Sequence, residues 1–119
     1  MPGLPGSFNV ARAMKNLQKF QRSLESLQQE LAERTVEASA GGGAVTAVAD
    51  GSGRLRALRI DPAAVDPSDL EMLQDVIVAA VNEALRQSRA MVEREMARLY
   101  QEMGLAGLPG LPGGPPAGP

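Results

Sequence analysis

The feature that most constrains the fold is a block of short, glycine-punctuated segments, residues 35–62, between two long stretches of helical periodicity. Alternating apolar and polar residues, and a run of small residues, predict three short strands in this block. Gly41-Gly42-Gly43 and Asp50-Gly51-Ser52-Gly53 predict the turns between them. We therefore predict an α+β fold in the order helix, three-stranded antiparallel β-meander, long helix.

The stretch before the block predicts a first helix over about residues 9–34, with Ser7 or Asn9 as its N-cap. Its later apolar residues recur at alternating spacings of three and four: Leu17, Phe20, Leu24, Leu27 and Leu31. This spacing is typical of a helix that packs along one seam against another helix.

The predicted strands cover residues 36–40, 44–49 and 54–60. The middle one carries small side chains on both faces, which favours close approach by another element. Arg54, Arg56 and Arg59 make the last strand basic, and pairing with the acidic start of the second helix is the simplest interpretation. By strand alternation, Arg56 is expected to share a face with Leu58 and Ile60.

The second helix is predicted to begin with Asp66 as its N-cap, Pro67 at the first helical position and Asp69 in a capping box. Gly104 is its expected stop. Such a helix is about 50–55 Å long at 1.5 Å per residue, so its C-terminal half must project or pack on a partner. A sheet this small cannot bury both helices, and the plan therefore implies an assembly.

We divide the chain into three parts: a flexible tail at residues 1–7, one folded domain at residues 8–103 and a disordered, Gly/Pro-rich tail at residues 104–119.

Composition argues against several function classes. The sequence has no cysteine and no histidine, and no nucleophile–base set or phosphate-binding loop. Helix capping explains the carboxylates of Asp66, Asp69 and Glu71, so we expect no catalytic residue, no metal and no cofactor. No apolar run approaches the roughly 20 residues that span a bilayer, and no secretion signal is visible, so we expect a cytoplasmic protein that does not enter the membrane.

The net charge is only −2, but charge is segregated along the chain. The first helix carries a basic stripe nearly opposite its apolar seam: Arg12, Lys15, Lys19 and Arg22. The stripe is either a solvated outer face or a row of phosphate contacts on duplex DNA. If the helices are antiparallel, Arg94 and Arg98 should come near Arg12 and Lys15. No constellation for reading bases stands out, so sequence specificity should be weak.

A second interpretation rests on the apolar row of the second helix: Val92, Met96, Leu99 and Met103. Packing is its simplest explanation, but methionine adapts to irregular partners. A prefoldin-like holdase or protein-interaction scaffold without DNA binding therefore stays open. A purely structural dimer that acts through a protein partner is a third, weaker possibility.

Several motifs, in this order and spacing, resemble the YbaB/EbfC family of bacterial nucleoid-associated proteins. They are Met14-Lys15-Asn16-Leu17, residues 36–43, Arg59-Ile60-Asp61-Pro62, residues 71–75 and residues 79–84, followed by a Gly/Pro-rich tail.

The resemblance implies an intertwined homodimer with a shared β core and projecting helices, located in the cytoplasm at the nucleoid. It also implies double-stranded DNA as partner, bound with little sequence preference by the projecting helices. On this chain that role falls on the following residues: Arg12, Lys15, Lys19, Arg22, Arg94 and Arg98. Four phosphate contacts per protomer predict a slope of about −3.6 for log affinity against log salt.

Overall fold

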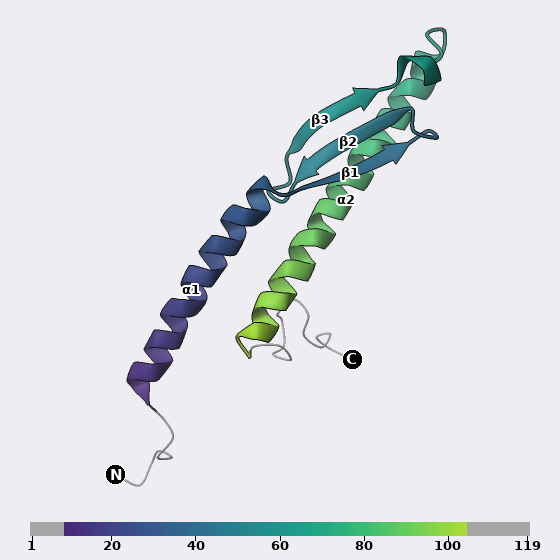
Figure 1. The fold of residues 1–119 in the computed structure, drawn as a ribbon. Coiled ribbons are helices and arrows are strands. Elements are labelled where there is room, and N and C mark those ends of the chain that lie inside the picture. Colours follow the sequence, from purple (N-terminus) through teal and green to yellow (C-terminus); the bar gives the residue numbers. More distant parts are fainter. Residues whose placement is uncertain (1–8, 105–119) are drawn as a thin grey trace, which may run out of the picture.

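The computed structural model describes residues 9–104. Its elements are helix α1 (Val10–Glu33), strands β1 (Thr35–Ala40), β2 (Val45–Asp50) and β3 (Leu55–Ile60), the short 3-10 helix η1 (Pro62–Ala64) and helix α2 (Leu70–Glu102). Figure 1 shows the sheet lying on one end of α2, while α1 runs back alongside the other end. The predicted order of helix, antiparallel meander and long helix is confirmed.

Some predictions fall outside the described residues. These are the tail at residues 1–7, the alternative N-cap Ser7, and all of the C-terminal tail except Gly104. Within residues 9–104, no helix is both long enough and apolar enough to cross a bilayer.

Helix α1 has nearly the bounds that the sequence predicts. Asn9 is its N-cap, and the side-chain oxygen of Asn9 accepts a hydrogen bond from the Arg12 backbone N–H at 3.2 Å. At the other end, only Arg34, in extended conformation, separates α1 from β1. The direction of the helix is therefore tied closely to the sheet.

The strands pair in chain order, β1–β2–β3, and both pairs are antiparallel. The β1–β2 register runs from Thr35 opposite Asp50 to Ala40 opposite Val45. Gly41, Gly42 and Gly43 close this hairpin with φ of 67°, 69° and 94°. Side chains other than glycine rarely adopt this left-handed region, which explains the glycine run.

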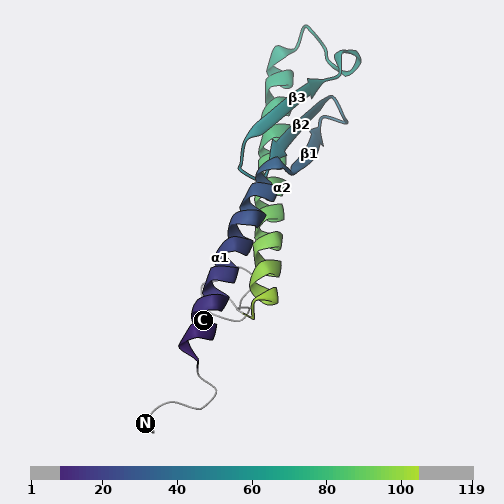
Figure 2. The ribbon, with the colours of Figure 1, turned by 60° about the vertical axis from the view of Figure 1, so that its left-hand side comes forward.

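The core lies between α2 and the first two strands, and Figure 2 shows the sheet against one side of α2. Its centre is built from alanine: Ala47 of β2 and Ala80 and Ala84 of α2 are fully buried. Small side chains let the helix and sheet backbones approach closely. The close approach predicted for the middle strand is thus confirmed.

Strand β3 is left largely uncovered, because α2 packs mainly against β1 and β2. Leu55, Leu58 and Ile60 lie opposite the inward-facing Ala49, Ala47 and Val45 of β2. They are nevertheless 44%, 38% and 41% exposed. We call these three residues the β3 apolar strip.

The pairing of β2 with β3 contains a β-bulge. Val48 pairs with Ala57 and Ala49 with Leu55, so Arg56 is the extra residue. The register leaves Arg56 without a partner on β2, so the prediction that it shares a face with Leu58 and Ile60 stays a prediction. A bulge re-aims side chains next to it, and Arg56 bonds to Asp50.

The predicted start of α2 was wrong. The helix begins at Leu70, and its N-cap is Asp69, whose carboxylate accepts from the Met72 N–H at 3.1 Å. The Asp66 carboxylate accepts from the Ser68 N–H and Oγ in a separate turn. Two aspartates three residues apart both carry cap signals, and this local turn engages the first one. Gly104, with φ of 75°, follows the helix as predicted.

Candidate nucleic-acid interface

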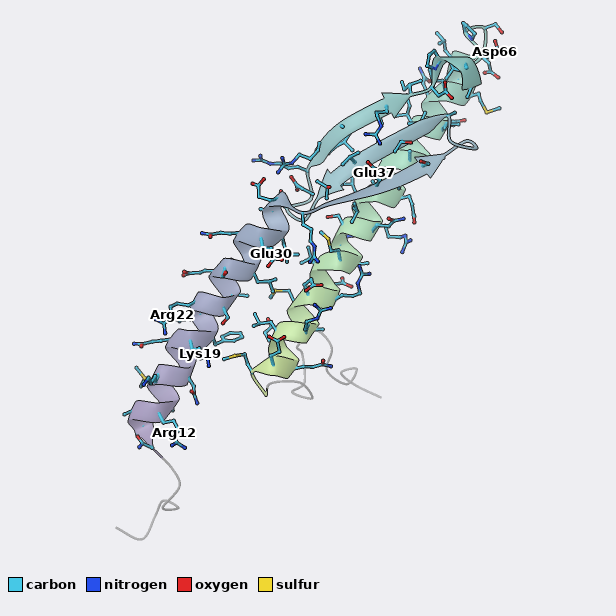
Figure 3. All side chains as sticks on the ribbon, in the orientation of Figure 1. Arg12, Lys19, Arg22, Glu30, Glu37 and Asp66 are labelled. Carbon is cyan, nitrogen blue, oxygen red and sulfur yellow. The ribbon has the colours of Figure 1, made fainter. Side chains whose placement is uncertain are left out.

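The cations of the basic stripe follow one another along α1. Arg12, Lys15, Lys19 and Arg22 are all exposed, and Figure 3 shows Arg12, Lys19 and Arg22 in succession, with Glu30 nearer the sheet. From Arg12 to Arg22 the helix rises about 15 Å. Within residues 9–104, the ion pairs involve other cations, so these four charges are not neutralised by a described carboxylate.

A groove of about 570 Å³ separates α1 from α2. It has charged residues of both signs around it: Lys19, Arg22, Arg34 and Arg98, with Glu30, Glu95 and Glu102. The sequence placed the basic stripe nearly opposite the helix-pairing seam. The structure instead puts Lys19 and Arg22 on a wall of this groove. The two helices meet at only a few points, so the groove between them stays open.

The helices are antiparallel, but their register differs from the expected one. Phe20 stacks on Tyr100 with ring centroids 5.9 Å apart. Arg98 is therefore level with Arg22, and Arg12 lies about 15 Å further along α1. The prediction that Arg94 and Arg98 come near Arg12 and Lys15 was wrong.

The two arginines of α2 also differ from each other. Arg98 lies 3.4 Å from Glu95, so the charge of Arg98 is partly neutralised. Glu95 also lies 3.5 Å from Arg34. Arg94 lines a different depression, beside Val36 and Arg86. The structure thus brings Lys19, Arg22 and Arg98 together and leaves Arg94 apart.

The arginines of β3 do not pair with α2, contrary to prediction. Arg56 contacts Asp50 at 2.5 Å and lies 3.8 Å from Glu33. Arg59 contacts Glu37 of β1 at 2.9 Å. The reason is the topology: α2 lies across β1 and β2, so the acids within reach of β3 are those of the sheet and the end of α1.

The acidic start of α2 serves local structure. Hydrogen bonds from Ser68 lower the pKa of Asp66, and Asp69 caps the helix. No group of three potential metal-ligating side chains occurs within residues 9–104. Further along α2, the Arg86 side chain, followed by that of Gln87, lowers the pKa of Glu83 to about 2. The carboxylates of Asp66 and Glu83 therefore stay ionised at neutral pH and bonded to their neighbours.

The apolar row of α2 is used mostly in packing. Leu99 is buried, and Val92 and Met96 face Leu31 and Gly51 across a small depression. The apolar seam of α1 is covered toward the sheet, where Leu31 is buried, but not at its far end. There Val10, Met14 and Leu17 are half exposed or more.

Sequence reasoning missed two features of this region. Arg34 lines the groove beside the predicted cations, but the basic stripe ends at Arg22 and acidic residues follow it, so the charge pattern gives no signal at Arg34. Asp50 is a fully buried carboxylate bonded to Arg56. Its Asp-Gly turn was recognised, but only the bulge brings Arg56 to it.

Together, fold and surface define a small α+β protein with a basic helix that projects from its sheet. Residues 6–103 match the profile of the YbaB/EbfC DNA-binding family. The chain belongs to the YbaB/EbfC family, as its motifs predicted.

Among its relatives, a nucleoid-associated protein of Moorella thermoacetica is 57% identical over 102 residues, which cover 86% of this chain and 98% of the relative. One of Acetivibrio thermocellus is 53% identical over 103 residues, covering 87% and 89%. One of Pelotomaculum thermopropionicum is 49% identical over 100 residues, covering 84% and 95%.

The fold is also similar to a solved structure. The crystal structure of an uncharacterized protein from Helicobacter pylori matches with a TM-score of 0.60 at 22% identity. The match covers 81% of this chain and 97% of the other.

Proposed function

We propose that this chain is a non-enzymatic, nucleoid-associated protein of the bacterial cytoplasm that binds duplex DNA through phosphate contacts, with little sequence preference. The observation that carries the proposal is the basic stripe: four cations along a projecting helix, with no described carboxylate paired to them. Membership of a DNA-binding family supports it.

The spacing of the stripe suits a DNA backbone. Each strand of duplex DNA carries one charge per about 3.4 Å of the axis, so a stripe about 15 Å long spans about four phosphates of one strand. Lys19 and Arg22 engage phosphates at the groove, and Arg12 and Lys15 engage them toward the end of α1. Arg98 contributes less because it shares its charge with Glu95. Arg94 belongs to a separate, weaker contact.

The binding unit is a homodimer, and a second copy of this chain covers the β3 apolar strip. Three exposed large apolar side chains on the α2 side of an edge strand support this assembly, because an open edge beside an apolar face favours pairing with another strand. Leu58→Asp should give the mass of a monomer in light scattering after size exclusion. Val78→Asp, at an exposed site on α2, should stay dimeric.

The test of DNA binding is fluorescence anisotropy with two unrelated duplexes of about 30 base pairs across a salt series. We expect similar affinity for both, with a slope near −3.6 per protomer. Lys15→Glu with Lys19→Glu should lower affinity by roughly 10- to 100-fold and leave the dimer intact.

Arg59→Glu with Arg89→Glu is the matched control, because it changes net charge equally at exposed sites off α1. It should leave affinity within about threefold of the parent. Absence of binding even at low salt would refute the proposal.

A second candidate function is a prefoldin-like holdase or scaffold without DNA binding. The exposed Val10, Met14 and Leu17 on the projecting helix favour it. Replacing all three with serine should abolish suppression of a client's aggregation under this alternative. Under the first proposal it should leave the salt slope unchanged.

A further inference from the structure

The turn that joins β2 to β3 docks on the C-terminal end of α1. The Gly51 N–H donates to the Leu31 carbonyl at 2.9 Å and to the Arg34 carbonyl at 3.1 Å. Arg56 Nη2 donates to the Ala32 carbonyl at 3.0 Å. The last carbonyls of a helix lack partners within the helix itself. Here the hairpin supplies them.

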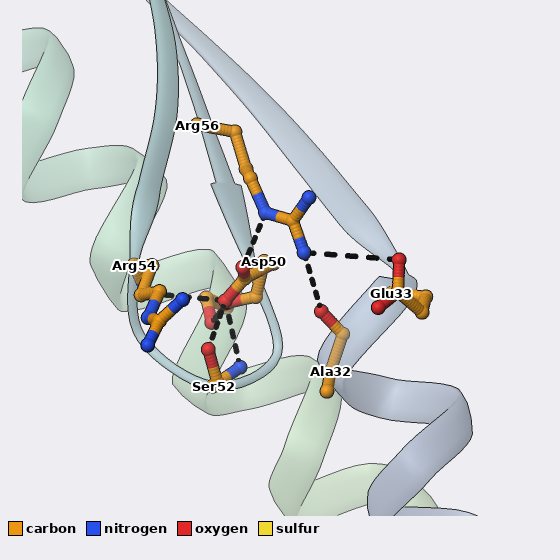
Figure 4. A network of polar contacts seen from close by, with 7 residues as sticks. Ala32, Glu33, Asp50, Ser52, Arg54 and Arg56 are labelled. Atoms are coloured by element: carbon orange, nitrogen blue, oxygen red, sulfur yellow. Dashed lines mark hydrogen bonds and ion pairs between the residues drawn. The ribbon is translucent and has the colours of Figure 1, made fainter.

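A buried carboxylate fixes the shape of this turn. Asp50 is fully buried, and its Oδ1 accepts from the Ser52 N–H at 2.9 Å, from Ser52 Oγ at 2.5 Å and from the Arg54 N–H at 3.1 Å. Its Oδ2 accepts from Arg56 Nε at 2.5 Å (Figure 4). The side chains of Ser52 and Arg56 lower the pKa of Asp50, so it remains charged.

The same turn is tied to α2. Ser88 is buried, and its Oγ donates to the Asp50 carbonyl at 2.5 Å. Asp50 and Gly51, adjacent in sequence, thus connect α2 to α1. This turn is bonded to both helices, so it helps to set the angle between α1 and α2.

The contact between turn and helix is too close for any side chain at residue 51. A Cβ added to Gly51 would lie 2.2 Å from the Leu31 carbonyl oxygen and 2.8 Å from its carbon. Both are backbone atoms and cannot rotate away. The docking therefore requires glycine for a steric reason.

Elsewhere α1 is held weakly. The groove of about 570 Å³ separates it from α2. The contacts across it include the stack of Phe20 on Tyr100 and the pair of Arg34 with Glu95 at 3.5 Å. The Arg34 side chain is 44% exposed, and an ion pair open to solvent on one side contributes only about 1 kcal/mol. The direction of α1 is thus decided mainly at its sheet end.

We propose that Asp50, Gly51 and Arg56 form an alignment joint, a set of positioning residues that holds α1 at one angle to α2 and so presents the basic stripe to DNA. The inference rests on the proposed function. Arg56 acts through α1 and is not itself a phosphate contact. Loosening the joint lowers DNA affinity while every cation of the stripe remains in place.

The angle can be measured directly, because the sequence has no cysteine. Cysteines introduced at the exposed Gln18, in the N-terminal half of α1, and at the exposed Gln101, near the C-terminal end of α2, carry the spin labels. Dilution with unlabelled chain restricts the measured distances to one protomer. We expect a narrow distance distribution in the parent, and a broadened or shifted one in Gly51→Ala and in Arg56→Gln.

Gly42→Ala is the matched control. Gly42 lies in the other hairpin turn, with φ of 69° and nothing within 4 Å of an added Cβ. The substitution strains the backbone away from α1, so stability falls and the distance distribution stays as in the parent. Arg56→Gln introduces no clash and keeps the test decisive if Gly51→Ala fails to fold.

DNA affinity is then measured on the same variants. If the loosened helix is aligned one tenth of the time, affinity falls about tenfold, and the salt slope changes by less than one phosphate contact. Unchanged distances in both variants would overturn the joint. Changed distances with unchanged affinity would overturn its role in binding.

Arg56→Gln could instead lower the salt slope of DNA binding by about 0.9 and leave the spin-label distance between α1 and α2 unchanged. That result would show that Arg56 contacts a phosphate, and it would overturn the positioning role. If the parent does not bind DNA, the proposed function fails, while the distances still decide whether the joint exists.

Discussion

At the sheet end of the molecule, α2 packs directly on β1 and β2 through fully buried alanines, whereas at its other end α2 faces α1 across a groove of about 570 Å³. The charged side chains differ in the same way. Near the sheet, Asp50, Arg56, Glu37 and Arg59 are paired. Along α1, the basic stripe has no described partner. The sheet end is tightly packed and stabilises the fold, whereas the end formed by α1 and α2 has, among its described residues, unpaired cations that can bind a ligand.

This difference shows how one chain combines a stable fold with an available surface. Small residues bring backbones together and remove solvent from the sheet end. Larger residues and spaced contacts keep the helical end open. The alignment joint lies where the two regions meet, at the hairpin turn.

The largest effect should come from overfilling the sheet end. Ala80→Leu adds three carbons at a fully buried site against the sheet, which should cost about 3 kcal/mol. For a domain of this size the Tm should fall by about 10–20 °C in thermal unfolding. Ala79→Leu, one residue away on the exposed side of α2, should change little. Equal losses would show that the two positions are packed alike.

Acid should weaken the sheet end next. The pKa of Asp50 is lowered well below its ordinary value of 3.8, and that of Glu83 is lowered to about 2. A lowered pKa in the folded state stabilises the fold at pH above the unfolded value, and that stabilisation is lost as pH falls. The Tm should therefore be constant from pH 7 to about 5 and should fall below about pH 4. Asp50→Asn should reduce this fall of the Tm at acid pH. If the Tm of the variant falls as steeply as that of the parent, Asp50 is not its cause.

At the end formed by α1 and α2, an unpaired cation should contribute more to DNA binding than a cation in an ion pair. Arg22→Gln should reduce the salt slope of DNA binding by about 0.9. Arg98→Gln should reduce it less, because Glu95 at 3.4 Å already neutralises part of its charge. The comparison is made by anisotropy titration at several salt concentrations. Equal reductions would remove the distinction between the two arginines.

The smallest effect should come from a surface pair on the sheet. Glu37 and Arg59 are 2.9 Å apart, and both side chains are more than half exposed. Glu37→Gln should change the free energy of unfolding by about 0.5 kcal/mol or less, measured by urea denaturation. A loss above about 1 kcal/mol would mean that this face is buried in the assembly.

Local pattern was sufficient to predict the order of the elements and most of their bounds. The Asn9 cap, the triple-glycine turn and the Gly104 stop each depend on a few neighbouring residues, so they are legible in the sequence. The start of α2 was not, because Asp66 and Asp69 carry equivalent local signals. Only the turn that Asp66 forms with Ser68 separates them.

The candidate site was predictable in part. The stripe of cations follows from helical periodicity alone, since residues three and four apart share a face. Its relation to α2 did not follow, because the stack of Phe20 on Tyr100 sets the register between two helices far apart in sequence. That register is what places Arg98 beside Arg22.

The sequence by itself determined the helix–meander–helix order, the alanine-rich middle strand, the basic stripe and the family, since each depends on local composition and spacing. The tertiary structure alone decided that Arg56 reaches Asp50 and that the turn carrying Gly51 docks on α1. The physical reason is that a β-bulge and a backbone contact across 20 residues (Leu31 to Gly51) leave no periodic trace in the chain.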